Sequence, residues 1–253
     1  MLKVRVIPCL LLKNHGLVKT VRFKEAKYVG DPVNAVKIFN EKEVDELSLL
    51  DITATIEMRK PNFTLIRDIA SECFMPFSYG GGIRSIEDIR QIFELGAEKV
   101  IVNSHAVENP DFISEASRLF GSQSIVVSVD VKKSLLNKYE IYIRSGTKNT
   151  KLNPVRFAEE MAKLGAGEIF LNSIDRDGTQ QGYDLDLIRS VTTAVDIPVI
   201  ACGGAGSLGH FTDAVHQAGA SAVAAGSFFV LHGKHRAVLI SYPETQMLKS
   251  VFG

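Results

Sequence analysis

The sequence contains few cysteines, and their arrangement excludes a disulfide-stapled or zinc-bound domain. Its 253 residues include only Cys9, Cys73 and Cys202, an odd number of cysteines that lie far apart and form no CxxC pair. Neither a disulfide framework nor a zinc site is therefore expected, and a reducing cytoplasm is the expected compartment. The six histidines are scattered without the spacing of metal ligands, so we predict no metal or other cofactor.

The chain also lacks an excess of charge and a long hydrophobic run. Its 29 basic and 29 acidic residues give a net charge of zero, whereas a general nucleic-acid binder carries a basic excess. No apolar run reaches the roughly 18 residues that span a bilayer. The short apolar stretch from Met1 to Leu12 lacks a signal-peptide cleavage site. Neither nucleic acid nor membrane is an expected partner.

What the sequence has is an alternation of apolar runs with amphipathic stretches. The runs are nearly continuous in apolar character, as is typical of parallel strands buried on both faces. The eight predicted strands are Val4–Leu12, Glu46–Ile52, Phe74–Tyr79, Lys99–Asn103, Ser124–Val131, Glu168–Asn172, Ile197–Cys202 and Ser221–Gly226. Residues that begin helices lie between them: Asp31-Pro32, Ser85 with Asp88, Asn109-Pro110, Asn153-Pro154, Asp184 and Ser207. Three glycines end helices: Gly96, Gly165 and Gly219.

The second half of the chain repeats the first. Strand, glycine-rich turn and capped helix recur between the segment from Met75 and the segment from Ile197, at a spacing of 122 to 123 residues. A coincidence of glycine-rich turns would not align the strands and the helix starts as well. The pattern predicts an α/β fold, a (β/α)8 TIM barrel in one domain, 1–253, built from half-barrels of about 1–122 and 123–253. A doubly wound open sheet is the alternative, and the repeat argues against it.

The repeat also predicts two phosphate sites. In (β/α)8 barrels the active site lies at the carboxyl ends of the strands, where backbone N–H groups of glycine-rich loops bind phosphate. One predicted site combines Gly203-Gly204 with Gly226-Ser227, and the other combines Gly81-Gly82 with Asn103-Ser104. For a single such loop the alternative is merely a tight strand-to-helix turn. The two pairs together predict a small substrate with a phosphate at each end.

Several segments resemble the cyclase subunit of imidazole glycerol phosphate synthase. They are Asp45–Ala54, Gly80-Gly-Gly-Ile, Ala106–Pro110, Phe120-Gly-Ser-Gln, Gly165-Ala-Gly-Glu-Ile, Ser173–Thr179 and Gly203-Gly-Ala-Gly206. The resemblance extends from about residue 4 to residue 229. It implies a (β/α)8 barrel that binds a glutaminase subunit at the N-terminal face, receives ammonia through the barrel and closes an imidazole ring.

The resemblance implies a catalytic pair of aspartates, of which this chain keeps one. The second matches Asp130, at the end of the fifth strand, and the first falls on Leu11. Aligning Lys13 with Lys132 in the two halves also puts Leu11 opposite Asp130. Leucine has no titratable proton, and loss of a general acid or base typically costs about 100- to 10,000-fold in rate. Asp51 and Asp177, at other strand ends, are candidates for a substitute carboxylate.

Other residues match family positions. Lys19 corresponds to a lysine on a mobile lid, with an ordinary solvated lysine as the alternative. Asp51, Asp177 and Gly178 match the substrate cleft, where the aspartates could equally cap turns. The ring of charges at the N-terminal mouth, implied as an ammonia gate, matches Arg5, Glu46, Lys99 and Glu168. Such charges would be costly at the base of an apolar barrel unless they paired.

The strand-one region and the C-terminal tail resemble a divergent paralogue associated with surface-polysaccharide gene clusters. That branch implies ammonia supply for acetamidino-sugar formation, with a sugar amidotransferase as a further partner. The basic cluster of His232, Lys234, His235 and Arg236 is expected near the second phosphate site, or else at a solvated helix start. Two other functions stay open. One is the histidine-pathway cyclase, tolerating Leu11, and the other is a non-catalytic barrel that docks a glutaminase and conducts ammonia.

Overall fold

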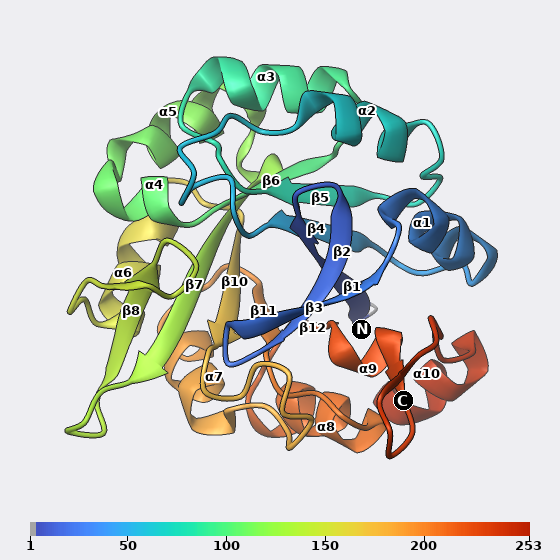
Figure 1. The fold of residues 1–253 in the computed structure, drawn as a ribbon. Coiled ribbons are helices and arrows are strands. Elements are labelled where there is room, and N and C mark those ends of the chain that lie inside the picture. The colour runs from blue at the N-terminus through green and yellow to red at the C-terminus, as the bar shows by residue number, and fades with distance from the viewer. Residues whose placement is uncertain (1–3) are drawn as a thin grey trace.

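Eight parallel strands pair edge to edge and close into a barrel in the computed structural model, which describes residues 4–253 (Figure 1). In order around the barrel they are β1 (Arg5–Lys13), β4 (Leu47–Asp51), β5 (Phe77–Gly80), β6 (Lys99–Val102), β7 (Ile125–Lys133), β10 (Glu168–Ser173), β11 (Val199–Cys202) and β12 (Ala222–Ala225). The barrel closes where β12 pairs with β1, with Arg5 opposite Ala222 and Pro8 opposite Ala225. The predicted (β/α)8 TIM barrel is confirmed.

The observed strands overlap all eight predicted runs, and the largest differences have a simple cause. β5 begins three residues later than predicted and β11 two residues later, in each case just after a proline, Pro76 or Pro198. Proline has no N–H to donate to a neighbouring strand. The two prolines occupy equivalent places in the two halves of the chain, so even this deviation follows the repeat.

Helices connect successive strands and cover the outside of the barrel (Figure 1). They are α1 (Pro32–Glu41), α2 (Phe63–Ala70), α3 (Ile86–Glu94), α4 (Ser104–Glu108), α5 (Asp111–Phe120), η1 (Ser122–Ser124), α6 (Pro154–Lys163), α7 (Leu185–Thr192), α8 (Leu208–Thr212), η2 (Asp213–Gln217), α9 (Ser227–Val230) and α10 (Thr245–Phe252). The side chains of Asp31, Asn153, Asp184 and Ser207 cap the helices that they were predicted to begin. Ser85 and Asp88 form the predicted capping box. The predicted helix start at Asn109 is wrong by two residues. The helix α5 begins at Asp111, so the Asn109 side chain does not cap it.

Successive residues of each barrel strand point to opposite faces and contribute to two different apolar layers. One cluster packs between the strands and the surrounding helices, for example Leu47, Leu49, Val127 and Val129. The other lies inside the barrel and is smaller: Ile7, Cys9, Ile101, Val126, Phe170, Ile200, Ala222 and Ala224. The interior is therefore a packed apolar column with polar side chains at its two ends, the arrangement expected for a barrel of eight strands.

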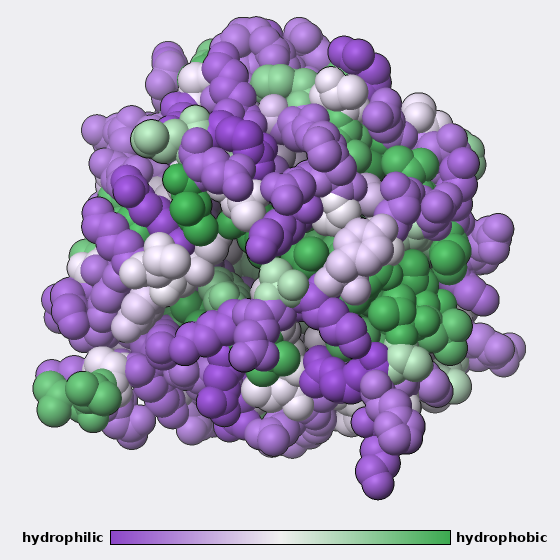
Figure 2. All heavy atoms as spheres, in the orientation of Figure 1, coloured by the Kyte–Doolittle hydropathy of each residue, from purple (hydrophilic) through white to green (hydrophobic). Residues whose placement is uncertain are grey.

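The repeat extends to features that the sequence did not predict. β1 continues into the antiparallel pair β2 (Gly16–Val21) and β3 (Lys24–Gly30), and β7 continues into β8 (Tyr139–Ile143) and β9 (Lys148–Asn149). Both excursions stand at the carboxyl ends of the barrel strands (Figure 1). At the tip of the β7–β8 hairpin Leu135 and Leu136 are largely exposed. Figure 2 shows an apolar protrusion from a mostly polar face where Figure 1 places this tip.

The C-terminal basic cluster adopts neither a helix nor a helix start. It occupies the turn of a hairpin formed by β13 (Leu231–His232) and β14 (Ala237–Val238). Arg236 contacts the loops of the barrel mouth, where its guanidinium donates to the Gly178 carbonyl at 3.1 Å. Among the described residues no helix is both long and apolar enough to cross a membrane.

Candidate functional site

Four charged side chains meet at the N-terminal end of the barrel. The Arg5 guanidinium contacts Glu46 at 2.5 Å and Glu168 at 2.8 Å, and the Lys99 ammonium lies 3.2 Å from each of the same carboxylates. Each cation thus bridges both anions, and the two glutamates are buried. The structure therefore brings together the four residues of the predicted gate, in the mutually paired form that burial of charge demands.

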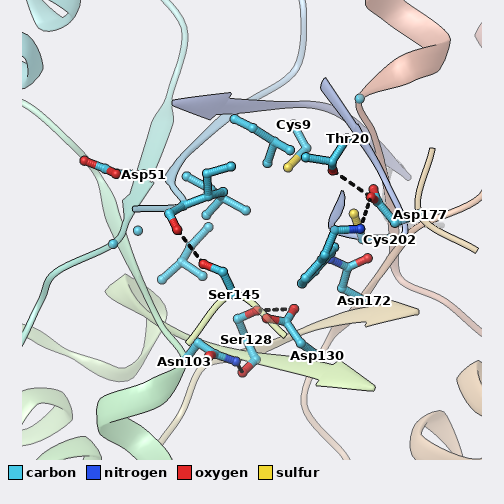
Figure 3. Close-up of a pocket in the computed structure, with 18 of the residues that line it drawn as sticks. Cys9, Thr20, Asp51, Asn103, Ser128, Asp130, Ser145, Asn172, Asp177 and Cys202 are labelled. Carbon is cyan, nitrogen blue, oxygen red and sulfur yellow. Dashed lines mark hydrogen bonds between the residues drawn. The ribbon is translucent and has the colours of Figure 1, made fainter. Parts of the chain in front are cut away.

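A pocket opens at the opposite end, where the barrel strands finish (Figure 3). Every residue predicted for the mouth lines this one pocket: Leu11, Lys19, Asp51, Gly81, Gly82, Asn103, Ser104, Asp130, Asp177, Gly178, Gly203, Gly204, Gly226 and Ser227. Residues from both halves of the chain face the same space. This is the end of the barrel at which active sites of the fold are built.

Asp130 lies on one wall of the pocket, on β7, beside Asn172 of β10. The two residues are register partners on adjacent strands. The Ser128 hydroxyl donates to Asp130 Oδ1 at 3.5 Å. Burial raises the pKa of the Asp130 carboxyl to about 7, although hydrogen bonds from Asn172 and Ser128 act in the opposite direction. A carboxyl with this pKa can accept or release a proton near neutral pH.

The equivalent place in the first half is apolar. Leu11 pairs in register with Leu50, as Asp130 pairs with Asn172. Since Leu50 and Asn172 are 122 residues apart, the two pairs are counterparts under the repeat. At these counterpart positions the pocket lining is therefore polar in the second half and apolar in the first.

The two other aspartates of the mouth are already engaged. Asp51 Oδ1 accepts hydrogen bonds from the Thr53 and Ala54 amides, both at 3.0 Å, and the Asp51 carboxylate pairs with Arg59. Asp177 Oδ2 accepts from the Thr20 hydroxyl at 2.8 Å and from the Phe23 amide at 3.2 Å (Figure 3). Burial raises the pKa of Asp177. Both side chains hold loops in place, so neither is a free substitute for the carboxylate missing at Leu11.

Lys19 is not a solvated lysine. It lies on β2, is buried, and its ammonium donates to the Cys9 carbonyl at 2.6 Å. Burial lowers the pKa of this amine. A Cβ atom on Gly226 would lie 2.2 Å from the Lys19 Nζ, so the ammonium packs directly on this glycine. The side chain therefore places a cation beside the second predicted phosphate loop.

The paired glycines have a structural reason as well as a possible binding role. Gly81 and Gly203 have φ of +118° and +87°, which side chains rarely adopt. A Cβ on Gly81 would lie 2.4 Å from the Asp51 carbonyl, and one on Gly203 would lie 2.6 Å from the Ser173 carbonyl. Close packing of neighbouring strand ends thus accounts for both glycines. The phosphate role stays a prediction.

Several pocket residues escaped the sequence analysis. Asn172, Ser128, Ser145, Cys9 and Cys202 also line the cavity. The thiols of Cys9 and Cys202 interact, which lowers the pKa of Cys9 and raises that of Cys202. Asn172 could have been found from strand alternation alone. Counting in twos from Glu168 passes Phe170 and reaches Asn172 on the inward face.

Comparison with known proteins agrees with this geometry. A model of the family described as "Histidine biosynthesis protein" matches residues 5–236. The chain belongs to this histidine biosynthesis protein family. It is 54% identical over 248 residues to the "Putative imidazole glycerol phosphate synthase subunit hisF2" of Pseudomonas aeruginosa, covering 98% of this chain and 99% of that protein.

Other members of the histidine biosynthesis protein family are similar over nearly their full length. The chain is 50% identical over 244 residues to the "Putative imidazole glycerol phosphate synthase subunit hisF3" of Vibrio vulnificus, covering 96% of this chain and 94% of that protein. It is 46% identical over 229 residues to the "Imidazole glycerol phosphate synthase subunit HisF" of Alkaliphilus metalliredigens, covering 90% and 91%. Within the family this protein is therefore HisF-like.

Proposed function

We propose that this HisF-like chain receives ammonia from a glutaminase subunit and serves acetamidino-sugar formation in surface-polysaccharide biosynthesis, in the cytoplasm. The observation that carries the proposal is Leu11, which faces the pocket where ring closure would need a second proton-exchanging group. Asp51 and Asp177 are committed to their own loops. Asp130 alone suffices for a reaction that adds a nitrogen without closing a ring.

The ring of Arg5, Glu46, Lys99 and Glu168 supports an ammonia route from the N-terminal face. It separates that face from the apolar interior, and uncharged ammonia crosses such an interior more readily than an ion does. The glutaminase would bind against this face. A sugar amidotransferase would act as a further partner on the nucleotide-linked sugar.

The substrate of the pocket is proposed to be small and phosphorylated. The loops Gly81-Gly82 and Gly203-Gly204 lie on opposite sides of the mouth, and α4 and α9 begin there without a side-chain cap. Their first amides are thus available to an anion. Catalysis would rest on Asp130, with Lys19 helping to bind the phosphorylated ligand.

A second candidate is the imidazole glycerol phosphate synthase cyclase of histidine biosynthesis. The names of its relatives in Pseudomonas aeruginosa and Alkaliphilus metalliredigens favour it. A third is a barrel without chemistry of its own, which docks a glutaminase and conducts ammonia. The polar pair Asp130 and Asn172 in the pocket argues against the third, because a conduit needs no group with a pKa of about 7.

An assay with free ammonia separates these candidates. The purified chain is incubated with excess ammonium salt and the bis-phosphorylated formimino-carboxamide ribonucleotide of histidine biosynthesis, whose disappearance is followed spectrophotometrically. We expect no turnover by the unmodified chain, and about 100- to 10,000-fold more in Leu11→Asp. Leu11→Asn is the matched control, since it is polar and of similar size but carries no titratable proton.

Robust turnover by the unmodified chain would refute the acetamidino proposal in favour of the histidine-pathway cyclase. Equal turnover by Leu11→Asn and Leu11→Asp would show that the reaction needs a polar side chain at position 11 and not one that exchanges a proton. If no variant reacts but the chain still stimulates a glutaminase, the non-catalytic barrel is correct.

A further inference from the structure

Three segments at the mouth of the barrel are strongly basic, although the whole chain is neutral. They are residues 13–30, which include β2 and β3, residues 132–151, which include β8 and β9, and residues 231–239, which include β13 and β14. These basic segments contain thirteen of the 29 lysines and arginines but only two of the 29 aspartates and glutamates. Their net charge is therefore +11, and that of the remaining residues is −11. In Figure 1 the β2–β3 hairpin crosses in front of the barrel and β8 lies at the lower left.

Most of this charge faces solvent and is not neutralised within the chain. Ten of the thirteen cations are exposed, and Lys19, inside the pocket, is the only one that is buried. Among the residues that the structure describes, two of the thirteen pair with a carboxylate, Arg144 with Glu108 and Lys151 with Glu140. The basic segments thus present an unbalanced positive surface around the mouth.

Exposed apolar side chains stand at the same end of the molecule. The tip of the β7–β8 hairpin exposes Leu135 and Leu136 in an ordered turn, where the Ser134 amide donates to the Lys138 carbonyl at 2.8 Å. The loop between β4 and α2 adds further apolar side chains at the mouth. Half of the twelve large apolar side chains that are exposed in the described part of the chain lie on these loops: Val21, Tyr28, Ile56, Met58, Leu135 and Leu136.

A small phosphorylated ligand does not account for this surface. Such a ligand needs cations inside the pocket, where Lys19 lies, and exposed leucines do not attract an anion. Single-stranded nucleic acid is bound by cations interleaved with stacking aromatic rings, and Tyr28 is the only phenylalanine or tyrosine exposed on the basic segments. Apolar side chains set among cations instead match a protein surface with apolar pockets and carboxylates around them.

We propose that the basic segments and the exposed leucines at the tip of the β7–β8 hairpin form the docking surface for the sugar amidotransferase, whose contact face is acidic and receives Leu135 and Leu136. The inference rests on the proposed function, since it takes the nitrogen to pass to a sugar held by another protein. The glutaminase is proposed to cover the opposite end of the barrel. The mouth is then the exit, and the partner that accepts the nitrogen binds there.

The chemistry of ammonia favours an acceptor protein that covers the mouth. Ammonia attacks through its lone pair, and water at neutral pH converts most free ammonia into the ammonium ion, which has no lone pair. A protein that excludes water from the rim keeps the nitrogen reactive until it meets the sugar. An anionic lipid surface would also match the cations and the leucines, but it would offer no acceptor carbon.

Charge also determines which part of the chain each partner binds. An acidic contact face is attracted to the basic segments and repelled by the remainder of the molecule, which carries the balancing negative charge. The amidotransferase and the glutaminase therefore do not compete for one surface. Both can be bound while ammonia passes between them.

The test is binding of the purified sugar amidotransferase of the same organism to the full chain, measured by isothermal titration calorimetry at about 50 and about 300 mM sodium chloride. We expect a one-to-one complex whose Kd rises at least tenfold with the salt. Lys27→Glu combined with Lys138→Glu, on two different segments, should raise the Kd about tenfold at low salt and much less at high salt, because salt screens exposed charges.

The leucines should respond differently from the lysines. Leu135→Ser combined with Leu136→Ser should raise the Kd about tenfold at both salt concentrations, because burial of apolar surface is not screened. The matched control is Arg118→Glu combined with Leu119→Ser, which changes an exposed cation and an exposed leucine at the end of α5 that leads to the start of β7. This control should bind like the unmodified chain. All the exchanged side chains are exposed, so each variant should keep the circular dichroism spectrum of the fold.

Three results would overturn the inference. They are the absence of binding, a Kd that does not depend on salt, and equal binding by the mouth variants and the control. If the amidotransferase does not bind but vesicles of phosphatidylglycerol bind the chain through Leu135 and Leu136, the surface is a membrane contact instead.

The Leu11 assay separates this inference from the proposed function. If the unmodified chain closes the imidazole ring although the amidotransferase binds at the mouth, the proposed reaction is wrong and the docking surface stands. If the assay supports the acetamidino proposal but the amidotransferase does not bind at the mouth, only the docking surface is wrong.

Discussion

Burial of Asp130 couples the stability of the fold to the chemistry of the pocket. The carboxyl group is enclosed by its neighbours on β7 and β10, and this burial raises its pKa from 3.8 to about 7. The folded protein therefore retains a proton that the unfolded chain releases between these two values. Stability from this group is complete below pH 3.8 and is lost as the pH rises through 7.

Asp130→Asn should therefore stabilise the protein at alkaline pH. The variant cannot ionise, so we expect its free energy of unfolding to exceed that of the unmodified chain by roughly 2 to 4 kcal/mol at pH 8.5 and to differ little at pH 4. Urea denaturation at several pH values measures the difference. A pH-independent difference would contradict the raised pKa, and Asp186→Asn, on the exposed face of α7, is the control.

Single residues were predictable where the repeat or the resemblance gave them a counterpart. Leu11 and Asp130 were matched before the structure was known, and they are counterparts in it. Asn172 was missed although strand alternation alone places it on the inward face of β10, at the pocket. The roles of Asp51 and Asp177 as loop anchors depend on hydrogen bonds that form only when distant segments meet.

Among the elements, the β2–β3 hairpin is held against the opposite side of the mouth. The Thr20 hydroxyl and the Phe23 amide donate to the Asp177 carboxylate, and the Arg22 amide donates to the Asp177 carbonyl at 3.0 Å. The hairpin thus places Lys19 inside the pocket, and these hydrogen bonds across the mouth all converge on one residue, Asp177. Elements held by few contacts open at low free-energy cost.

Thr20→Val should loosen this hairpin without unfolding the barrel. Losing one hydrogen bond worth about 1 kcal/mol should raise the open population by about fivefold. Trypsin should then cleave after Arg22 or Lys24 correspondingly faster, which mass spectrometry can follow over time. Thr193→Val, which removes a local bond at the end of α7, should leave the rate unchanged. Equal rates for all three proteins would show that Asp177 does not hold the hairpin.

The barrel strands were predictable and the hairpins were not, for one physical reason. Barrel strands are buried on both faces and therefore read as apolar runs. β3 exposes five consecutive residues, Lys24–Tyr28, and its sequence resembles a loop. Its strand conformation follows from pairing with β2, not from an apolar pattern of its own.

At the scale of the molecule, the two halves meet at two seams. β6 pairs with β7 at one seam, and β12 pairs with β1 at the other. Each seam consists of parallel pairs like those within a half. If the predicted halves, about 1–122 and 123–253, were separated at these seams, each would expose two strand edges. Each edge would be complementary to an edge of the other half.

Co-expressed fragments 1–122 and 123–253 should assemble into a barrel. We expect a one-to-one complex with the circular dichroism spectrum of the intact chain, because each half covers the strand edges of the other. Fragments divided at residue 60, between β4 and α2, are the control and should assemble poorly. Failure of the first pair together with success of the second would contradict the half-barrel division.

The unequal walls of the mouth have a consequence for how a ligand can be oriented. Two phosphate loops related by an internal twofold would accept a molecule with similar anionic ends either way round. The pair Leu11 and Leu50 on one side and the pair Asp130 and Asn172 on the other remove that ambiguity, since a polar centre between the two ends can face only the second pair. If both loops bind phosphate as predicted, a barrel of two similar halves would thus distinguish the two ends of its ligand through two positions in each half.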